Sequence, residues 1–214
     1  MRQGILFLCL ALLNIVGCTG QNKKDFQFNY KQKMNNELRY LTIGGGCFWC
    51  VESCFQKLKG VESVVSGYSG GHKDNPTYEE VCTGETGHAE VVQIAYDPEI
   101  ISFQQLMEVF FFLHDPTQLN RQGNDVGTQY RSVIFYRTEN EKQEAETAIK
   151  KSEATGKWEG KYVTEIAPFI KFWPAEQYHQ GYYNNNPSQP YCSAVVGPKI
   201  RKFEKHFGDL GWLK

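Results

Sequence analysis

The sequence has no excess of charge of either sign, no internal repeat and no apolar run long enough to cross a membrane. Its 23 lysines and arginines nearly balance its 24 aspartates and glutamates, and the net charge at pH 7 is −1. Nucleic-acid binders normally carry a basic patch or stripe, so the composition argues against this class. The 214 residues are 41% hydrophobic and 22% charged. This composition is globular, and the length suits one domain of about 100–200 residues.

The N-terminus has the pattern of a secretory signal. Arg2 gives a basic start, the apolar run 5–16 follows, and Gly17 precedes Cys18. The run is too short to span a bilayer. The sequence Ile-Val-Gly-Cys resembles the lipobox of bacterial lipoproteins, in which the cysteine becomes the lipidated first residue; a plain signal cleaved nearby is the alternative. We therefore expect a signal over 1–17, a lipid on Cys18, a polar tether over 18–38, and one exported, membrane-anchored domain over 39–214.

Hydrophobic periodicity predicts an α+β domain with two layers. Several expected strands follow one another without an intervening helix, which favours α+β. Ser102 with Gln105, and Thr138 with Glu141, match helix capping signals. Residues 116–129 are expected to form a polar loop. The expected strands cover 40–46, 61–68, 88–96, 130–136 and 161–167, and the expected helices cover 47–59, the segment after Ser102, 138–154, 175–183 and the segment after Pro198.

The cysteines point to redox chemistry. There are seven, and Cys9 leaves with the signal. If Cys18 is lipidated, five remain, and an odd number in an exported protein suggests reactive thiols more than a closed disulfide framework. The five are Cys47, Cys50, Cys54, Cys82 and Cys192.

Cys47 is the strongest candidate for a nucleophile. It follows three glycines at the expected start of a helix, where free N–H groups and the helix dipole lower a thiol pKa. The glycines would let a substrate approach the backbone closely; a buried structural cysteine is the alternative. Cys50 lies three residues on, on the same helix face, within reach of a disulfide. A zinc half-site is the rival interpretation, but the sequence has no second C-x-x-C and no H-x3-5-H. Cys54 is expected to pack in the core.

Glu90 is the candidate acid. It shares one face of an alternating strand with Val92 and Ile94. A carboxylate on an apolar face is costly, so its pKa should rise or it should be paired. A glutamate kept neutral near pH 7 can act as a general acid. The alternative is that this end of the strand is exposed to solvent.

Four motifs together resemble one known family. GGGCFWCVE, GYSGG, NPTYEEVCTGETGHAEVV and GNDVGTQYRS occur in this order, and they are similar to the A-type peptide-methionine sulfoxide reductases over about residues 40–207. The resemblance implies a two-layer α/β sandwich with a mixed sheet and a ferredoxin-like core. It also implies reduction of the S-epimer of methionine sulfoxide, free or in oxidised proteins, without a metal or an organic cofactor. We expect a monomer.

The resemblance also implies roles for individual residues. Cys47 would attack the sulfoxide sulfur, and Glu90 would give a proton to the sulfoxide oxygen. Two tyrosines and an aspartate would surround that oxygen, and two aromatic residues would hold the S-methyl group. The two tyrosines are Tyr78 and Tyr130, and the aspartate is Asp125. The two aromatic residues are Phe48 and Trp49.

The cysteine that resolves the resulting sulfenic acid is left open by the sequence. Many family members have glycine where this chain has Cys50 and use a C-terminal cysteine, and this chain has both Cys50 and Cys192. Cys50 is favoured, and Cys82 is expected to be structural. A thioredoxin-like protein would then reduce the disulfide. The rival functions are a thiol–disulfide oxidoreductase using Cys47 and Cys50, which would give Glu90 no task, and a metal-binding lipoprotein.

Overall fold

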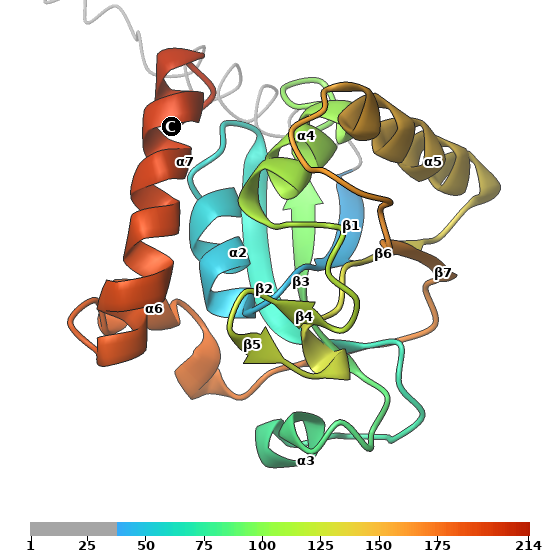
Figure 1. Cartoon of the computed structure of the whole chain (residues 1–214), viewed down its shortest axis with the longest axis vertical. Helices are drawn as coiled ribbons and strands as arrows, with labels where there is room; N and C mark the ends of the chain where they lie inside the picture. The colour runs from blue at the N-terminus through green and yellow to red at the C-terminus, as the bar shows by residue number, and fades with distance from the viewer. Residues whose placement is uncertain (1–37) are drawn as a thin grey trace, which may run out of the picture. The chain divides into compact units, whose positions relative to one another are not determined.

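A six-stranded sheet organises the part of the chain that the computed structural model describes, residues 38–214 (Figure 1). The strand order is β7-β6-β1-β3-β2-β8. All neighbouring strands are antiparallel except β6 and β7, which are parallel. The sheet is therefore mixed, and the α+β expectation is confirmed. The strands are β1 (Arg39–Gly44), β2 (Val61–Ser69), β3 (Ala89–Tyr96), β6 (Val133–Tyr136), β7 (Glu165–Pro168) and β8 (Phe172–Pro174).

The expected signal peptide and the lipidation of Cys18 lie outside the described residues, as does the tether up to residue 37. Within residues 38–214, no helix combines the length and the apolar character that a membrane crossing requires.

Four longer helices and several short elements complete the domain. A two-stranded hairpin, β4 (Arg121–Gln122) with β5 (Asp125–Val126), lies apart from the main sheet. The helices are α2 (Phe48–Phe55), α3 (Tyr78–Cys82), α4 (Phe103–Leu113), α5 (Glu139–Ala154), α6 (Tyr182–Asn185) and α7 (Gly197–Asp209), with the 3-10 turns η1 (Thr128–Tyr130) and η2 (Gln177–His179) and the π-helical turn η3 (Cys192–Val196).

The main core lies between one face of the sheet and the helices α2, α4, α5 and α7. On β3 the side chains alternate as expected. Val92, Ile94 and Tyr96 enter this core, while Ala89 and Val91 join a smaller cluster on the opposite face. Glu90 belongs to the helix-covered face and is only 1% exposed. The alternation therefore carries an acid into the interior, below the start of α2.

Both capping signals form as the sequence predicts. The Ser102 side chain accepts from the Gln105 N–H, and the Gln105 side chain accepts from the Ser102 N–H. Thr138 accepts from the Glu141 N–H at the start of α5. The local signals succeed because each bond satisfies an N–H group that the first turn of a helix leaves free.

The helix expected over 175–183 is wrong. Pro174 ends β8, and residues 175–181, which contain η2 and lead into α6, run as a connecting segment. Side-chain and backbone bonds tie this segment to β2: Gln180 bonds both the N–H and the carbonyl of Ser66, and the Ala175 N–H donates to the Ser66 carbonyl. Gly181 adopts φ +63°. Tertiary bonds therefore override the local helical pattern.

Three boundaries also differ from expectation. The helix after Cys47 ends at Phe55 and continues only as turns to Gly60. The loop 116–129 contains the hairpin β4–β5. The last helix is preceded directly by η3, so helical backbone begins before Pro198. Because proline has no N–H, Pro198 cannot donate to the carbonyl four residues earlier, which suits a wider π turn there.

Candidate active site

Cys47 is the N-cap of α2, immediately after the glycine turn that ends β1. Its backbone is extended (φ −60°, ψ 123°), and its carbonyl accepts from the Cys50 N–H at 3.2 Å. The residue as a whole is partly exposed, whereas its thiol is desolvated by burial. The glycines are needed for contacts within the protein rather than only for a substrate. A Cβ on Gly44 would lie 2.6 Å from the Glu90 carbonyl oxygen, and one on Gly45 would lie 2.9 Å from the Phe110 ring.

Glu90 lies against the start of the same helix. Its Oε2 accepts from the Phe48 N–H at 3.1 Å. Burial raises its pKa to about 8, although the bond from Phe48 lowers it in part; the charge of Asp125 raises it further. The carboxyl group is therefore largely protonated at pH 7. The sequence left two interpretations of Glu90 open. The structure agrees with a buried acid and disagrees with an exposed strand end.

The Cys47 thiol differs from expectation. Burial raises its pKa well above the usual value, and the nearby Glu90 carboxylate raises it further. The Trp49 N–H and the Tyr191 hydroxyl, which both hydrogen-bond the thiol, lower it only in part. The helix start was expected to favour a thiolate, but desolvation and the neighbouring acid outweigh that effect. The resting site therefore holds a thiol beside a carboxylic acid.

Tyr78 and Tyr130 enter the site from separate elements. Tyr78 is the first residue of α3 and Tyr130 the last of η1, and both are partly buried. Burial, followed by the Glu90 charge, raises the pKa of both hydroxyls far above the usual value. Both are therefore protonated and can donate hydrogen bonds at neutral pH.

Asp125 is paired with a tyrosine that sequence reasoning missed. The Tyr191 hydroxyl donates to Asp125 Oδ2 at 2.6 Å. The same hydroxyl bonds the Cys47 thiol, so Tyr191 links the aspartate to the sulfur. A single tyrosine in a proline-rich segment offers no periodicity or spacing, so no signal in the sequence could have singled it out.

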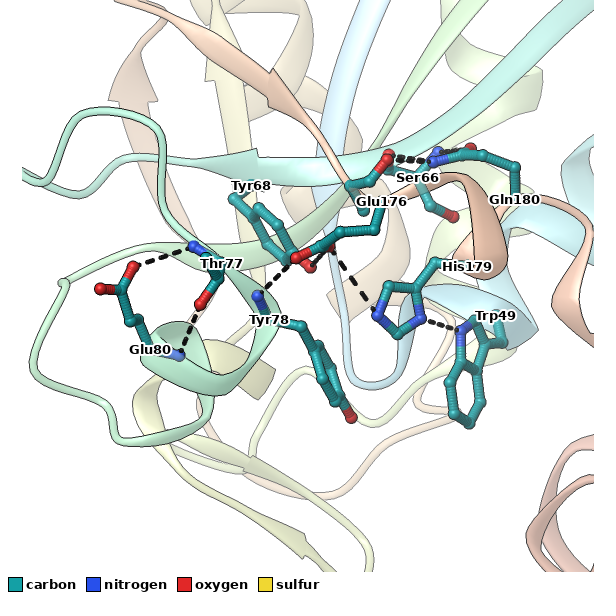
Figure 2. A network of polar contacts seen from close by, with 10 residues as sticks. Trp49, Ser66, Tyr68, Thr77, Tyr78, Glu80, Glu176, His179 and Gln180 are labelled. Atoms are coloured by element: carbon teal, nitrogen blue, oxygen red, sulfur yellow. Dashed lines mark hydrogen bonds and ion pairs between the residues drawn. The ribbon is translucent and has the colours of Figure 1, made fainter.

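Phe48 and Trp49 lie in a group of aromatic rings. Phe48 is 1% exposed, and its ring lies 5.1 Å from His179. Trp49 stacks on Tyr182 with ring centroids 3.8 Å apart. Its indole N–H donates to His179 Nδ1 at 3.0 Å, as Figure 2 shows. His179 and Tyr182 were missed because they lie in the segment that was expected to be a helix.

All five cysteines within residues 38–214 are free thiols. Cys50 is buried and close enough for its charge to raise the pKa of Cys47. A hydrogen bond from the Cys54 thiol lowers the pKa of Cys50, whereas burial raises that of Cys54 in the core. Cys192 is buried at the start of η3. Cys82, which was expected to be structural, is exposed at the end of α3 and bonds Tyr78.

The site thus combines a thiol at a helix start, a buried carboxylic acid, hydroxyl donors and an aromatic wall. Among the described residues, no three histidine, cysteine, aspartate or glutamate side chains are grouped to hold a metal ion. A thiol with a carboxylic acid beside it is the arrangement expected of a cysteine-dependent enzyme.

Comparison with known proteins identifies which enzyme class this is. The family model described as peptide methionine sulfoxide reductase matches residues 39–210. The peptide methionine sulfoxide reductase MsrA of Sulfolobus acidocaldarius is 56% identical over 173 residues, which cover 81% of this chain and 97% of that protein. The corresponding protein of Nautilia profundicola is 57% identical over 163 residues, or 76% of this chain and 92% of that protein.

Solved structures agree. Mxr1 of Saccharomyces cerevisiae in its reduced form has a TM-score of 0.68 and 37% identity over 74% of this chain and 91% of that one. Methionine sulfoxide reductase A of Corynebacterium diphtheriae has a TM-score of 0.65 and 39% identity. The match covers 72% of this chain and 77% of that one. The chain belongs to the peptide methionine sulfoxide reductase family, and it is an enzyme that reduces methionine sulfoxide.

Proposed function

We propose that the enzyme reduces the S-epimer of methionine sulfoxide, in oxidised proteins and as the free amino acid, through Cys47. The Cys47 sulfur attacks the sulfoxide sulfur and forms a sulfur–sulfur bond, while the sulfoxide oxygen takes up a proton. The sulfur–oxygen bond of the substrate and the sulfur–sulfur bond then break as the oxygen transfers to Cys47. Methionine leaves, reduced by two electrons, and Cys47, oxidised by two electrons, becomes a sulfenic acid whose proton balances the one that the thiol lost. The observation that carries this proposal is the buried, protonated Glu90 beside the thiol.

Each surrounding group has a task in this reaction. Glu90 gives its proton to the sulfoxide oxygen as charge develops there, and it recovers a proton when the sulfenic acid forms. Tyr78 and Tyr130 donate hydrogen bonds to the same oxygen. Asp125 orients Tyr191, whose hydroxyl bonds the thiol. Phe48 and Trp49 hold the S-methyl group against their ring faces.

The two epimers of methionine sulfoxide test the proposal. With dithiothreitol as reductant, we expect residues 19–214 to convert the S-epimer alone, measured as methionine formed. Turnover of neither epimer by folded protein with titratable thiols would favour the thiol–disulfide oxidoreductase. That alternative explains Cys47 and Cys50 but leaves the buried acid and the tyrosine donors without a task.

Cys50 is the proposed resolving cysteine. It lies in the turn that Cys47 begins, and the Cys54 hydrogen bond favours its thiolate. Its sulfur attacks the sulfenic sulfur of Cys47, a disulfide forms and water leaves. Cys192 is the alternative; it is buried at the start of η3 and directly follows Tyr191, whose hydroxyl lies beside the Cys47 thiol. A thioredoxin-like protein then reduces the disulfide by thiol exchange.

Replacing Cys50 by serine should separate chemistry from recycling. Single-turnover formation of methionine should stay intact, and dithiothreitol, which can reduce a sulfenic acid directly, should still support turnover. Turnover with a thioredoxin-like donor should fall below about one-tenth of wild type, because no disulfide forms for it to attack. Both rates are measured as methionine released. Cys192→Ser is the comparison: if it blocks recycling while Cys50→Ser does not, Cys192 is the resolving cysteine.

We also propose that the enzyme is exported and that a lipid on Cys18 anchors it to a membrane. The support is the sequence of a short apolar signal ending at a lipobox-like cysteine. Cys18→Ser should move the protein from the membrane fraction to the soluble fraction on cell fractionation. Attachment that persists in the serine variant would contradict a lipid anchor at this residue.

A further inference from the structure

Glu176 has no role in the proposed chemistry, yet donors from three different elements surround its carboxylate (Figure 2). The Tyr68 hydroxyl on β2 donates to Oε2 at 2.9 Å. The Tyr78 backbone N–H, at the start of α3, donates to Oε1 at 2.9 Å. His179 Nε2, on η2, is buried and lies 4.0 Å from Oε2, beyond hydrogen-bond distance, and it has no hydrogen-bond partner among the described residues.

Two of these contacts lead to residues with proposed roles around the substrate. Tyr78 carries the hydroxyl proposed to bond the sulfoxide oxygen, and the bond from its N–H to Glu176 holds the backbone from which that side chain extends. His179 accepts the Trp49 indole N–H on Nδ1, so a neutral His179 must carry its proton on Nε2, which faces Glu176. The carboxylate therefore influences Tyr78 through the backbone and Trp49 through the histidine.

We propose that Glu176 is a positioning residue that sets the Tyr78 hydroxyl and the Trp49 indole in their mutual arrangement around the substrate. The inference rests on the roles proposed above for Tyr78 and Trp49. It concerns how these two groups are held, because Glu176 itself bonds neither reacting sulfur.

A carboxylate suits this position because the Tyr78 N–H and His179 Nε2–H can only donate, and an ionised carboxylate only accepts. Partial burial would raise the pKa of Glu176, but hydrogen bonds from its own backbone, from the Tyr78 N–H and from Tyr68 outweigh burial, and the pKa lies below its usual value. Glutamine has the same shape but replaces one acceptor oxygen by an NH₂ donor. Glu176→Gln therefore removes the acceptor pattern without opening a cavity.

Glu80 supplies a matched control at the same helix. Its side chain accepts from the Thr77 N–H, and the Thr77 hydroxyl accepts from the Glu80 N–H, which completes the capping box of α3. It is another carboxylate at the start of α3, but the Tyr78 N–H donates to Glu176 rather than to Glu80. Glu80→Gln keeps a residue that capping boxes accept, so it should change both kinetic constants by less than about 2-fold.

The first test is a double-mutant cycle on single-turnover methionine formation with the S-epimer of methionine sulfoxide. Glu176→Gln should lower the rate constant at saturating sulfoxide by about 10-fold, because a misplaced Tyr78 stabilises the transition state less, and should raise the half-saturating concentration through Trp49. In a Tyr78→Phe background, the same change should lower the rate constant by less than about 2-fold, since the hydroxyl is already absent. An equal loss in both backgrounds would overturn the inference.

The second test measures the environment of the Trp49 indole directly. The Trp49 indole N–H signal in a ¹H–¹⁵N spectrum, assigned by its absence in Trp49→Phe, should shift in Glu176→Gln and stay in place in Glu80→Gln. An unmoved signal in Glu176→Gln overturns the inference. If Tyr78→Phe alone leaves the rate constant unchanged, the proposed role of Tyr78 is wrong and the inference about Glu176 is wrong with it. If Tyr78→Phe lowers the rate constant but the effects of Tyr78→Phe and Glu176→Gln simply add, only the inference about Glu176 is wrong. Glu176→Asp, one methylene shorter, serves in both tests if the glutamine variant does not fold.

Discussion

Replacing Cys47 by serine should abolish methionine formation, with a loss of at least about 10³-fold in the single-turnover rate. The reaction needs a sulfur that can lose its proton, attack the sulfoxide sulfur and then carry its oxygen. A hydroxyl in the same buried place, where even the thiol pKa is raised, is far less ionised. Methionine released per enzyme, from stereochemically pure S-sulfoxide without reductant, measures the effect.

The same exchange of thiol for hydroxyl at Cys82 is the control. Cys82 is exposed at the end of α3, and serine retains a hydroxyl that can bond Tyr78. Cys82→Ser should stay within about 3-fold of wild type, the range of surface substitutions. A sulfenic acid trapped on wild type by a 1,3-dicarbonyl reagent should be missing from Cys47→Ser. Residual activity above a few per cent in a folded Cys47→Ser enzyme would exclude Cys47 as the nucleophile.

The parts of the fold that depend on residues close together along the chain could be predicted from the sequence. The capping pairs at Ser102 and Thr138 form because both partners lie within one turn. The alternation along β3 was readable because a period of two assigns each side chain to a face. The same alternation correctly marked Glu90 as an acid on the core face.

The segment 175–183 could not be predicted in this way. Its residues suit a helix, but the bonds between Gln180 and Ser66 join positions 114 residues apart, and no local pattern reports them. His179 and Tyr182, which contact Trp49, were missed for this reason. Tyr191 was missed because its partners Asp125 and Cys47 come from other elements.

The ionisation of Cys47 illustrates a different limit. The sequence correctly indicates the helix start, and a helix start by itself lowers a thiol pKa. How deeply the sulfur is buried, and that Glu90 lies beside it, follow only from the packing of β3 under α2. Two correct local inferences, a thiol at a helix start and an acid on a core face, therefore combined into a wrong expectation for the thiol.

Replacing Glu90 by glutamine should lower the second-order rate constant for the S-sulfoxide by about 10²–10⁴-fold, the usual contribution of a general acid. The amide fits the same space and its oxygen can still accept from the Phe48 N–H, but it cannot transfer a proton to the sulfoxide oxygen. Glu52→Gln is the control, since Glu52 is also buried, with a pKa raised by burial, and accepts from the Gly181 N–H. It should cost less than about 3-fold in rate.

The pH dependence of the rate constant distinguishes a general acid from a residue with a purely structural role. The active form needs a Cys47 thiolate, whose fraction grows about tenfold per pH unit below its raised pKa, and a protonated Glu90, whose fraction falls about tenfold per unit above pH 8. The wild-type rate constant should therefore rise up to pH about 8 and then level off, whereas that of Glu90→Gln should continue to rise. The stability of the protein should also depend on the ionisation of Glu90. Because its pKa of about 8 in the folded protein exceeds the ordinary 4.5, the free energy of unfolding of wild type should fall as the pH rises between these two values. This contribution should be absent in the glutamine variant. A glutamine variant that still levels off near pH 8 would show that another group titrates there and that Glu90 is not the acid.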